Sequence, residues 1–344
     1  MRKNFYLAAL AVLALASCSK SEIIDEKPTA DKTPMVFTSY AGAETRAAAD
    51  ASNVVVGDLQ TDGFKVVGVE KESTSATTGN VYLNNLTYSW NGTASKYDNA
   101  AGVKYYWPNK NTYMDFHAVY PAGKTITLGT NNIGASINYA AYAEADFAED
   151  VVAANKLNES CLAHTTPATV SSVALAFSHI KNQVSFAFCS NSDDTNLTTT
   201  VKSVKLTYVK SGTYTYATSS ADAAWGSQVN ETTTPKEYYA TATAVEKLAT
   251  SGTQSYTALG TGLLMIPAAA ALTVTVEYDV KQTNNGNYVV SDFTGKNAKT
   301  FTITPSAMNT KYLYNVKLPV GVEPITFTAT LSDWTDSSNE IAVQ

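Results

Sequence analysis

The sequence is poor in the residues on which most catalytic and metal sites depend. Its 344 residues include three cysteines and three histidines, and only 16% of them are charged. No zinc-type cysteine spacing, HExxH motif, GxSxG nucleophile elbow or phosphate-binding glycine loop occurs. His117, His164 and His179 lie on separate segments, so each is interpreted as a surface or structural residue. The sequence therefore offers no catalytic residue, and we expect neither a metal nor a cofactor.

Positive charge is scarce as well. Lysine and arginine together number 24 against 30 aspartate and glutamate residues, which gives a formal net charge of −6. Proteins that bind nucleic acids present a basic face to the phosphates, so nucleic acid is not an expected partner. Arginine occurs only as Arg2 and Arg46. Arg46 is thus the one arginine left once the N-terminus has been removed.

The longest apolar run, Phe5–Ala16, is shorter than the roughly 20 residues that a membrane-spanning helix needs. It follows a basic start and ends in small residues, which is typical of a secretory signal. Its end, Leu15-Ala16-Ser17-Cys18, resembles the bacterial lipobox. That resemblance implies cleavage before Cys18 and lipidation of its sulfur, so residues 1–17 are assigned to a lipoprotein signal peptide. The alternative is an ordinary signal peptide with an incidental cysteine.

Two cysteines remain, Cys161 and Cys189. They could form a disulfide in an exported protein. Two separate thiols are the preferred interpretation, because Cys161 lies in a predicted linker and Cys189 ends a predicted strand.

Short apolar runs separated by turn residues dominate the rest of the chain. Tyr113–Tyr120 alternates between two faces, the period-two pattern of a half-buried strand. Leu272–Val280 alternates in the same way, and Asn285-Gly286 joins it to Tyr288–Val290 in a two-residue hairpin turn. Helical patterning is confined to a short segment, Ala140–Ala148. The expected fold is therefore all-β and built of β-sandwiches.

The strand pattern also predicts the domain organisation. Residues 18–46 form a polar tether and a first strand, Met35–Tyr40. The weakest patterning lies between Leu157 and Val170, so a boundary is expected near residue 168. It separates an N-terminal β-sandwich, 47–168, from a C-terminal one, 169–344.

Short phrases occur in a fixed order along the chain: Met35–Thr38, Glu44–Ala47, Tyr106–Pro108, Tyr113–Pro121, Leu175–Ile180, Leu264–Pro267, Lys311–Val316 and Ile325–Thr335. Each phrase alone has little specificity for any family. Their order and spacing, with the lipobox in front, resemble the fimbrillin family, the lipoprotein-derived subunits of type V pili. The resemblance spans nearly the whole chain. It implies two tandem transthyretin-like Greek-key β-sandwich domains, in agreement with the strand pattern.

The resemblance also implies a route of maturation. Fimbrillins reach the outer membrane as lipoproteins, are cut after an arginine by an arginine-specific protease, and polymerise into a cell-surface fimbrium by strand exchange. In this chain the implied scissile bond joins Arg46 to Ala47, and a solvated loop arginine without a role is the alternative. The implied partners are other copies or related fimbrillin subunits, the outer membrane through the lipid, and a host or bacterial surface ligand. The strand displaced on maturation would comprise Met35, Val36, Phe37, Thr38, Ser39 and Tyr40.

The C-terminal segment supplies the predicted donor strand. Its apolar residues alternate with polar ones and so share one face of a strand, and a weaker strand follows. These residues are Ile325, Phe327, Ala329 and Leu331, then Ile341 and Val343. Alternatively, Ile325–Leu331 is a core strand of its own domain, and only the weaker strand is free to donate.

Two other functions stay open. One is a non-polymerising pilus-tip adhesin or surface glycan-binding lipoprotein of the same fold, in which Trp90, Trp107 or Trp225 could stack on sugars. Packing within the fold is the preferred interpretation of these tryptophans. The other is an exported enzyme, which a catalytic cluster would support.

Overall fold

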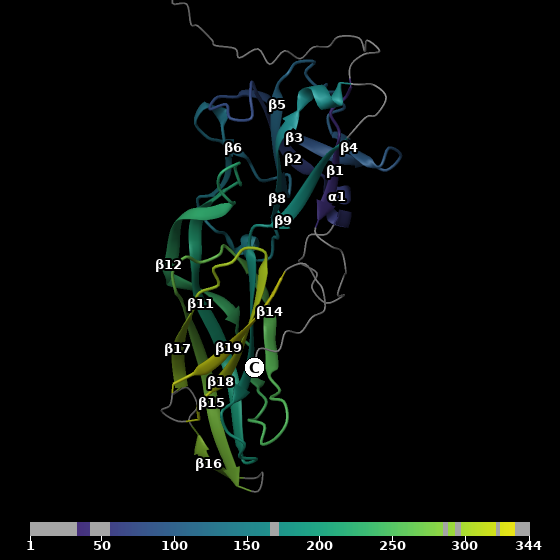
Figure 1. Ribbon diagram of the computed structural model, residues 1–344. Helices are drawn as coiled ribbons and strands as arrows, with labels where there is room; N and C mark the ends of the chain where they lie inside the picture. Colours follow the sequence, from purple (N-terminus) through teal and green to yellow (C-terminus); the bar gives the residue numbers. More distant parts are fainter. Residues whose placement is uncertain are drawn as a thin grey trace, which may run out of the picture.

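The computed structural model describes residues 33–41, 56–165, 172–284, 288–292, 297–320 and 324–333. Over these ranges the regular secondary structure is almost entirely β-strand, and the predicted all-β fold of β-sandwich units is confirmed. The molecule is elongated, with one unit stacked on the other (Figure 1). No helix in these ranges combines the length and the apolar character that a membrane crossing requires.

Seven strands form a closed ring in the first unit, in the order β1-β4-β3-β2-β5-β8-β9. β1 closes this ring, because it pairs with β9 on one side and with β4 on the other. The strands are β1 (Phe37–Ala41), β2 (Phe64–Lys71), β3 (Asn80–Asn91), β4 (Lys96–Asn99), β5 (Tyr113–Tyr120), β8 (Val152–Ser160) and β9 (Val173–His179).

The second unit contains two sheets that enclose a core. One sheet has the strand order β14-β10-β18-β19, and the other β16-β15-β11-β7-β6, with β12 and β13 paired to β11 and β17 to β15. The strands of the smaller sheet are β10 (Asn182–Ser190), β14 (Thr257–Met265), β18 (Thr310–Leu318) and β19 (Thr326–Asp333). Those of the larger sheet are β6 (Thr127–Leu128), β7 (Ala135–Tyr139), β11 (Leu197–Thr215), β12 (Ala224–Tyr239), β13 (Thr243–Ala244), β15 (Leu272–Asn284), β16 (Tyr288–Asp292) and β17 (Asn297–Ile303).

Antiparallel pairing of β15 with β16 confirms the predicted hairpin, and its last residue pair joins Asn284 to Tyr288. The two-residue turn at Asn285-Gly286 stays a prediction, because residues 285–287 lie outside the described residues. Strand pairing also crosses the expected boundary near residue 168. β7 precedes residue 168 but pairs with β11 of the second unit, whereas β9 follows it and pairs with β1 and β8 of the first. The division of the chain into two domains near residue 168 therefore stays a prediction.

β5 is buried on both faces, so the prediction of a half-buried strand is wrong. Met114, Phe116 and Ala118 face the core of the first unit, whereas Val119 belongs to the core of the second. The expected solvation of the face that carries His117 is wrong for the same reason, because His117 is only 2% exposed. Packing between the units covers the face that would otherwise meet water.

Helical structure is brief: α1 (Val56–Asp62) and the 3-10 turns η1 (Thr130–Asn132), η2 (Glu144–Phe147) and η3 (Cys161–His164). The predicted helix at Ala140–Ala148 is wrong, since only η2 forms there. α1 was not predicted, because Leu59 is its one fully buried side chain and seven residues show no helical period. Gly63 ends α1 with a φ of +72°, where an added Cβ would lie 2.3 Å from the Tyr88 carbonyl oxygen.

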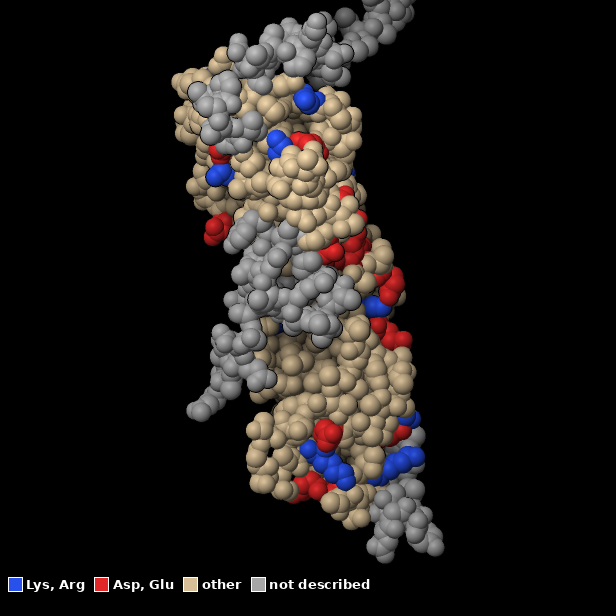
Figure 2. Space-filling view, turned by 90° about the vertical axis from the view of Figure 1, so that its right-hand side faces the viewer, with Lys and Arg blue, Asp and Glu red and all other residues tan. Residues whose placement is uncertain are grey.

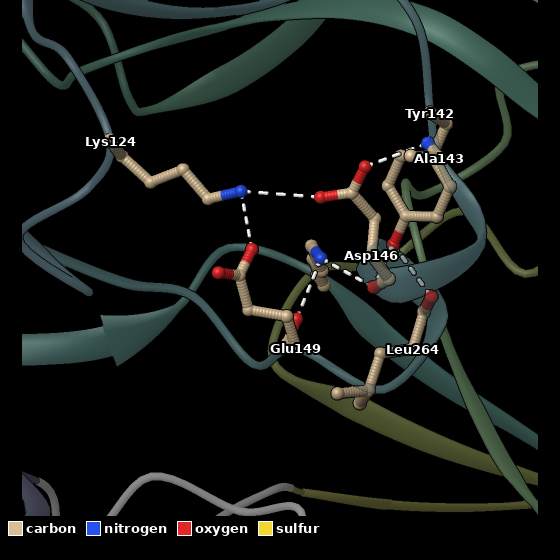
Figure 3. Close-up of polar contacts among 7 residues, drawn as sticks. Lys124, Tyr142, Ala143, Asp146, Glu149 and Leu264 are labelled. Atoms are coloured by element: carbon tan, nitrogen blue, oxygen red, sulfur yellow. Dashed lines mark hydrogen bonds and ion pairs between the residues drawn. The ribbon is translucent and has the colours of Figure 1, made fainter.

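A polar network around η2 links the two units (Figure 3). Lys124 forms ion pairs with Asp146 and Glu149, and the Tyr142 hydroxyl donates to the Leu264 carbonyl of β14 at 2.6 Å. The buried Lys181 ammonium donates to the carbonyl oxygens of Asp146 and Glu149 at 2.8 and 2.7 Å, and burial lowers its pKa to about 8. Lys181 stands between β9 and β10. The network therefore joins η2 and the connection between β9 and β10 to β14 of the smaller sheet.

Candidate strand-exchange site

The first element of the candidate site is the groove that β1 occupies. β1 runs parallel to β9 through five residue pairs, from Phe37 opposite Val173 to Ala41 opposite Phe177. On its other side it pairs with β4 only at Phe37 and Tyr97. Most of the main-chain pairing of β1 is therefore with β9.

The residues just before β1 extend this contact. The Met35 amide donates to the Tyr105 carbonyl at 2.7 Å, and the Trp107 amide donates to the Thr33 carbonyl at 3.0 Å. A cavity of about 410 Å³ opens beside this end of the groove, lined by residues 34–36 and by the β3–β4 region up to Tyr105. Residues 33–41 are thus bound along this groove by main-chain hydrogen bonds.

Side chains on one face of this segment fill the core of the first unit. Met35 is 3% exposed and Phe37 is fully buried. The Phe37 ring meets Tyr88 and Phe116 edge-to-face, with centroids 4.7 and 5.2 Å away. Two positions farther on, the Ser39 Oγ lies 2.8 Å from the Tyr97 hydroxyl. Along the direction of β1, this face of the groove accordingly holds the large side chains of Met35 and Phe37, followed by the small side chain of Ser39.

The second element of the site is β19. It pairs with β18 through eight consecutive residue pairs without a register shift, and it ends the smaller sheet. Its side chains are largely exposed: Phe327 is 37% and Leu331 51% exposed. Phe327 packs beside Phe301 and Tyr314, with ring centroids 4.9 and 5.9 Å away. β19 thus pairs within its own unit, as the alternative prediction of a core strand requires. It is, however, an exposed edge strand rather than a buried one.

On the side of the molecule seen in Figure 2, charged groups lie on the upper part, along the right-hand edge and toward the lower end. β19 itself has no charged residue before Asp333. β12, another strand at a sheet edge, contains Pro235, Lys236 and Glu237, and its register with β11 shifts at four places. Charge, proline and bulges protect an edge against further pairing. The edge of β19 lacks all three within the strand until its last residue.

The structure does not bring every predicted site residue together. Cys18, Arg46, Ala47, Ile341 and Val343 lie outside the described residues. The segment Met35–Tyr40 is in the groove, whereas Ile325, Phe327, Ala329 and Leu331 are in the other unit. Sequence reasoning missed the floor of the groove, Tyr88, Tyr97 and Phe116, because these residues come from three different strands.

Other candidate residues take structural roles. Cys161 and Cys189 are both buried and free, as preferred. Trp107 stacks on His164 at 3.8 Å, and the Trp225 indole donates to the Ile180 carbonyl at 2.6 Å. Both tryptophans therefore contribute to packing within the fold.

Comparison with known proteins places the chain in a family. The model of the fimbrillin-like family matches residues 45–334, and no curated protein sequence matches. A fimbrial protein from Bacteroides vulgatus has a similar structure, with a TM-score of 0.59 at 17% identity over 88% of this chain and 99% of the other. A fimbrilin from Porphyromonas gingivalis matches with a TM-score of 0.43 at 11% identity over 89% of this chain and 99% of the other. Because the family model covers most of its length, the chain belongs to the fimbrillin-like family.

Proposed function

We propose that the protein is a structural subunit of a cell-surface fimbria, that it is exported as a lipoprotein, and that copies join by strand exchange. The observation that carries this proposal is the position of β1. β1 closes the ring of the first unit and places Phe37 in its core, yet it precedes Arg46 in the sequence, whereas the other six strands of the ring follow it. A terminal strand of this kind is the one that a single cut can separate from its fold.

Cleavage after Arg46 would make that cut, five residues after the end of β1. β1 would then be held by main-chain pairing and packing alone. Its loss would leave amide and carbonyl groups of β9, Tyr105 and Trp107 without partners. Each buried polar group left unpaired costs about 1–3 kcal/mol, so the empty groove would favour any strand that restores these bonds.

β19 of a neighbouring copy is the strand that we propose for this role. The side chains of β19 lose little burial of their own on release, because they are already largely exposed. Release also breaks the pairing with β18, which the pairing in the groove would replace. In the groove its large apolar side chains would each gain about 1.5–3 kcal/mol on full burial. The exposed edge of β19 favours a subunit that propagates a stalk over a tip adhesin, since a stalk subunit must lend a strand and a tip subunit need not. Assembly of this kind requires no catalytic residue.

The test begins with the purified full-length protein. Treatment with an arginine-specific protease is expected to produce a ladder of polymers on a denaturing gel run without boiling, whereas Arg46→Ala should remain monomeric. N-terminal sequencing of the polymers should start at Ala47. Polymers that retain Met35–Tyr40 in covalent linkage would contradict the proposal.

Lipidation is tested separately. Cells grown with labelled palmitate should incorporate the label into the wild-type protein and not into Cys18→Ala, because the sulfur of Cys18 is the proposed acceptor. Cys189→Ala is the matched control, since this buried thiol is remote from the N-terminus in sequence. Equal labelling of wild type and Cys18→Ala would exclude Cys18 as the acceptor.

A further inference from the structure

β1 and β19 share a pattern of side chains. Residues 35–39 read Met-Val-Phe-Thr-Ser, and residues 325–329 read Ile-Thr-Phe-Thr-Ala. In both segments two large apolar residues, two positions apart, are followed on the same face by a small one. Phenylalanine and the threonine after it are identical when the segments are aligned in the same chain direction.

We propose that β19 of a second copy enters the groove in the same direction and register as β1. Ile325 then takes the position of Met35, Phe327 that of Phe37, and Ala329 that of Ser39. This inference rests on the fimbrial function proposed above and adds to it the direction and the register of the incoming strand. The inserted strand would run parallel to β9, as β1 does.

The shape of the groove selects this direction. The Tyr97 hydroxyl lies 2.8 Å from the Ser39 Oγ, so a large side chain pointing the same way as Ser39 would have to displace this hydroxyl. A reversed strand that kept Phe327 at the position of Phe37 would press Ile325 against Tyr97. It would also leave Ala329 in the space of Met35, which is 3% exposed in the intact chain. When Phe327 is kept at the position of Phe37, the same direction alone places large side chains at both large positions. A reversed strand with Ile325 at the position of Phe37 would bring Glu323 to the position of Ser39.

The face away from the core makes the register measurable. On β9, Ala174 and Ala176 are exposed and stand opposite Thr38 and Tyr40 of β1. In the proposed register Thr328 lies opposite Ala174, and Thr330 lies opposite Ala176. In a reversed strand centred on Ala329 these partners are exchanged. One centred on Phe327 brings Thr326 to Ala174.

The experiment combines one cysteine on β9 with one on β19 and oxidises the assembled fibre. Ala174→Cys with Thr328→Cys, and Ala176→Cys with Thr330→Cys, are expected to form covalent ladders that reductant dissolves. The crossed combinations, Ala174→Cys with Thr330→Cys and Ala176→Cys with Thr328→Cys, are the matched controls and should not crosslink. The native thiols do not interfere, because Cys161 and Cys189 are buried.

Each outcome is informative. Crosslinks in the crossed combinations, or between Thr326→Cys and Ala174→Cys, overturn the proposed direction or register. Fibres that form without any crosslink show that β19 is not the donor, while the fimbrial function stands. If the protease produces no fibres even from wild type, the proposed function itself fails. For variants that do not assemble, a synthetic peptide of residues 324–333 with cysteine at position 328 should form a disulfide with the cleaved Ala174→Cys monomer, and a peptide with cysteine at position 330 should not; the reverse preference overturns the register.

Discussion

Replacing Phe37 with alanine is expected to lower the free energy of unfolding of the full-length protein by about 3–5 kcal/mol, the usual cost of removing a buried phenylalanine ring. Phe37 is fully buried, and its ring packs against Tyr88 and Phe116 at the centre of the first unit. The deletion would therefore leave a cavity in the ring that β1 closes. Urea denaturation followed by tryptophan fluorescence measures the effect, because Trp107 contacts the same Phe116 ring.

Thr38→Ala is the matched control for this prediction. Thr38 is the next residue of the same strand, is partly exposed, and makes only a 3.4 Å contact to the Ser172 hydroxyl. Its replacement should change the stability by less than about 1 kcal/mol. Equal losses for both variants would show that Phe37 does not fill the core. If β1 is removed on maturation, neither substitution should alter the stability of the assembled fibre.

Acid is expected to weaken the protein through His117. Burial disfavours the charged imidazolium and lowers the His117 pKa to about 4, and Lys71 acts in the same direction while Asp115 opposes it. The unfolded chain, with the ordinary value of about 6.5, therefore binds a proton on this ring at a higher pH than the folded protein does. The stabilisation by neutral His117 is complete above pH 6.5 and is lost as the pH falls to 4. The loss amounts to about 3 kcal/mol.

His117→Phe isolates this contribution. It keeps an aromatic ring against Tyr216, which lies 5.0 Å from the His117 ring, and it cannot titrate. The difference in unfolding free energy between the variant and wild type should grow in favour of the variant between pH 6.5 and 4. A difference that stays constant over this range would contradict the assignment. The readout reports on the junction of the units, because Tyr216 also donates to the Ala118 carbonyl of β5 at 2.8 Å.

Sequence patterning can predict strands that have one face in a core and one in solvent. The alternating segment Leu272–Val280 is such a strand, in β15. β9 and β18 also alternate strictly between buried and more exposed residues, and alternation along a strand is a direct record of such burial. β5 shows the limit of prediction from alternation. Its face with Asp115, His117 and Val119 indicated contact with solvent, but the other unit covers it. β12 was not predicted, because a largely exposed strand need not alternate.

The candidate site was predictable in its parts but not as a groove. The apolar run Met35–Tyr40 indicated a strand, yet no local pattern could indicate that its partner is Val173–His179. The alternation of Ile325–Leu331 likewise identified the apolar face of β19 and could not indicate that this face lies uncovered at a sheet edge. Both missing facts are tertiary, because pairing and coverage depend on residues far away in the sequence.

β1 is the first strand of the described chain to be synthesised, and within the first unit its main partner β9 is the last strand to be made. Thr38 and its neighbour Ser172 are 134 residues apart, so the strand has no β9 to pair with until more than half of the chain exists. Closing so long a loop is slow because its entropy must be lost before the contacts form. Once β9 has joined the first unit, and until β1 pairs with it, the unit presents an open groove to which a strand of another chain could bind prematurely. The covalent connection between β1 and the rest of its own unit protects against this error. It gives β1 an effective concentration at the groove that strands of separate molecules do not reach.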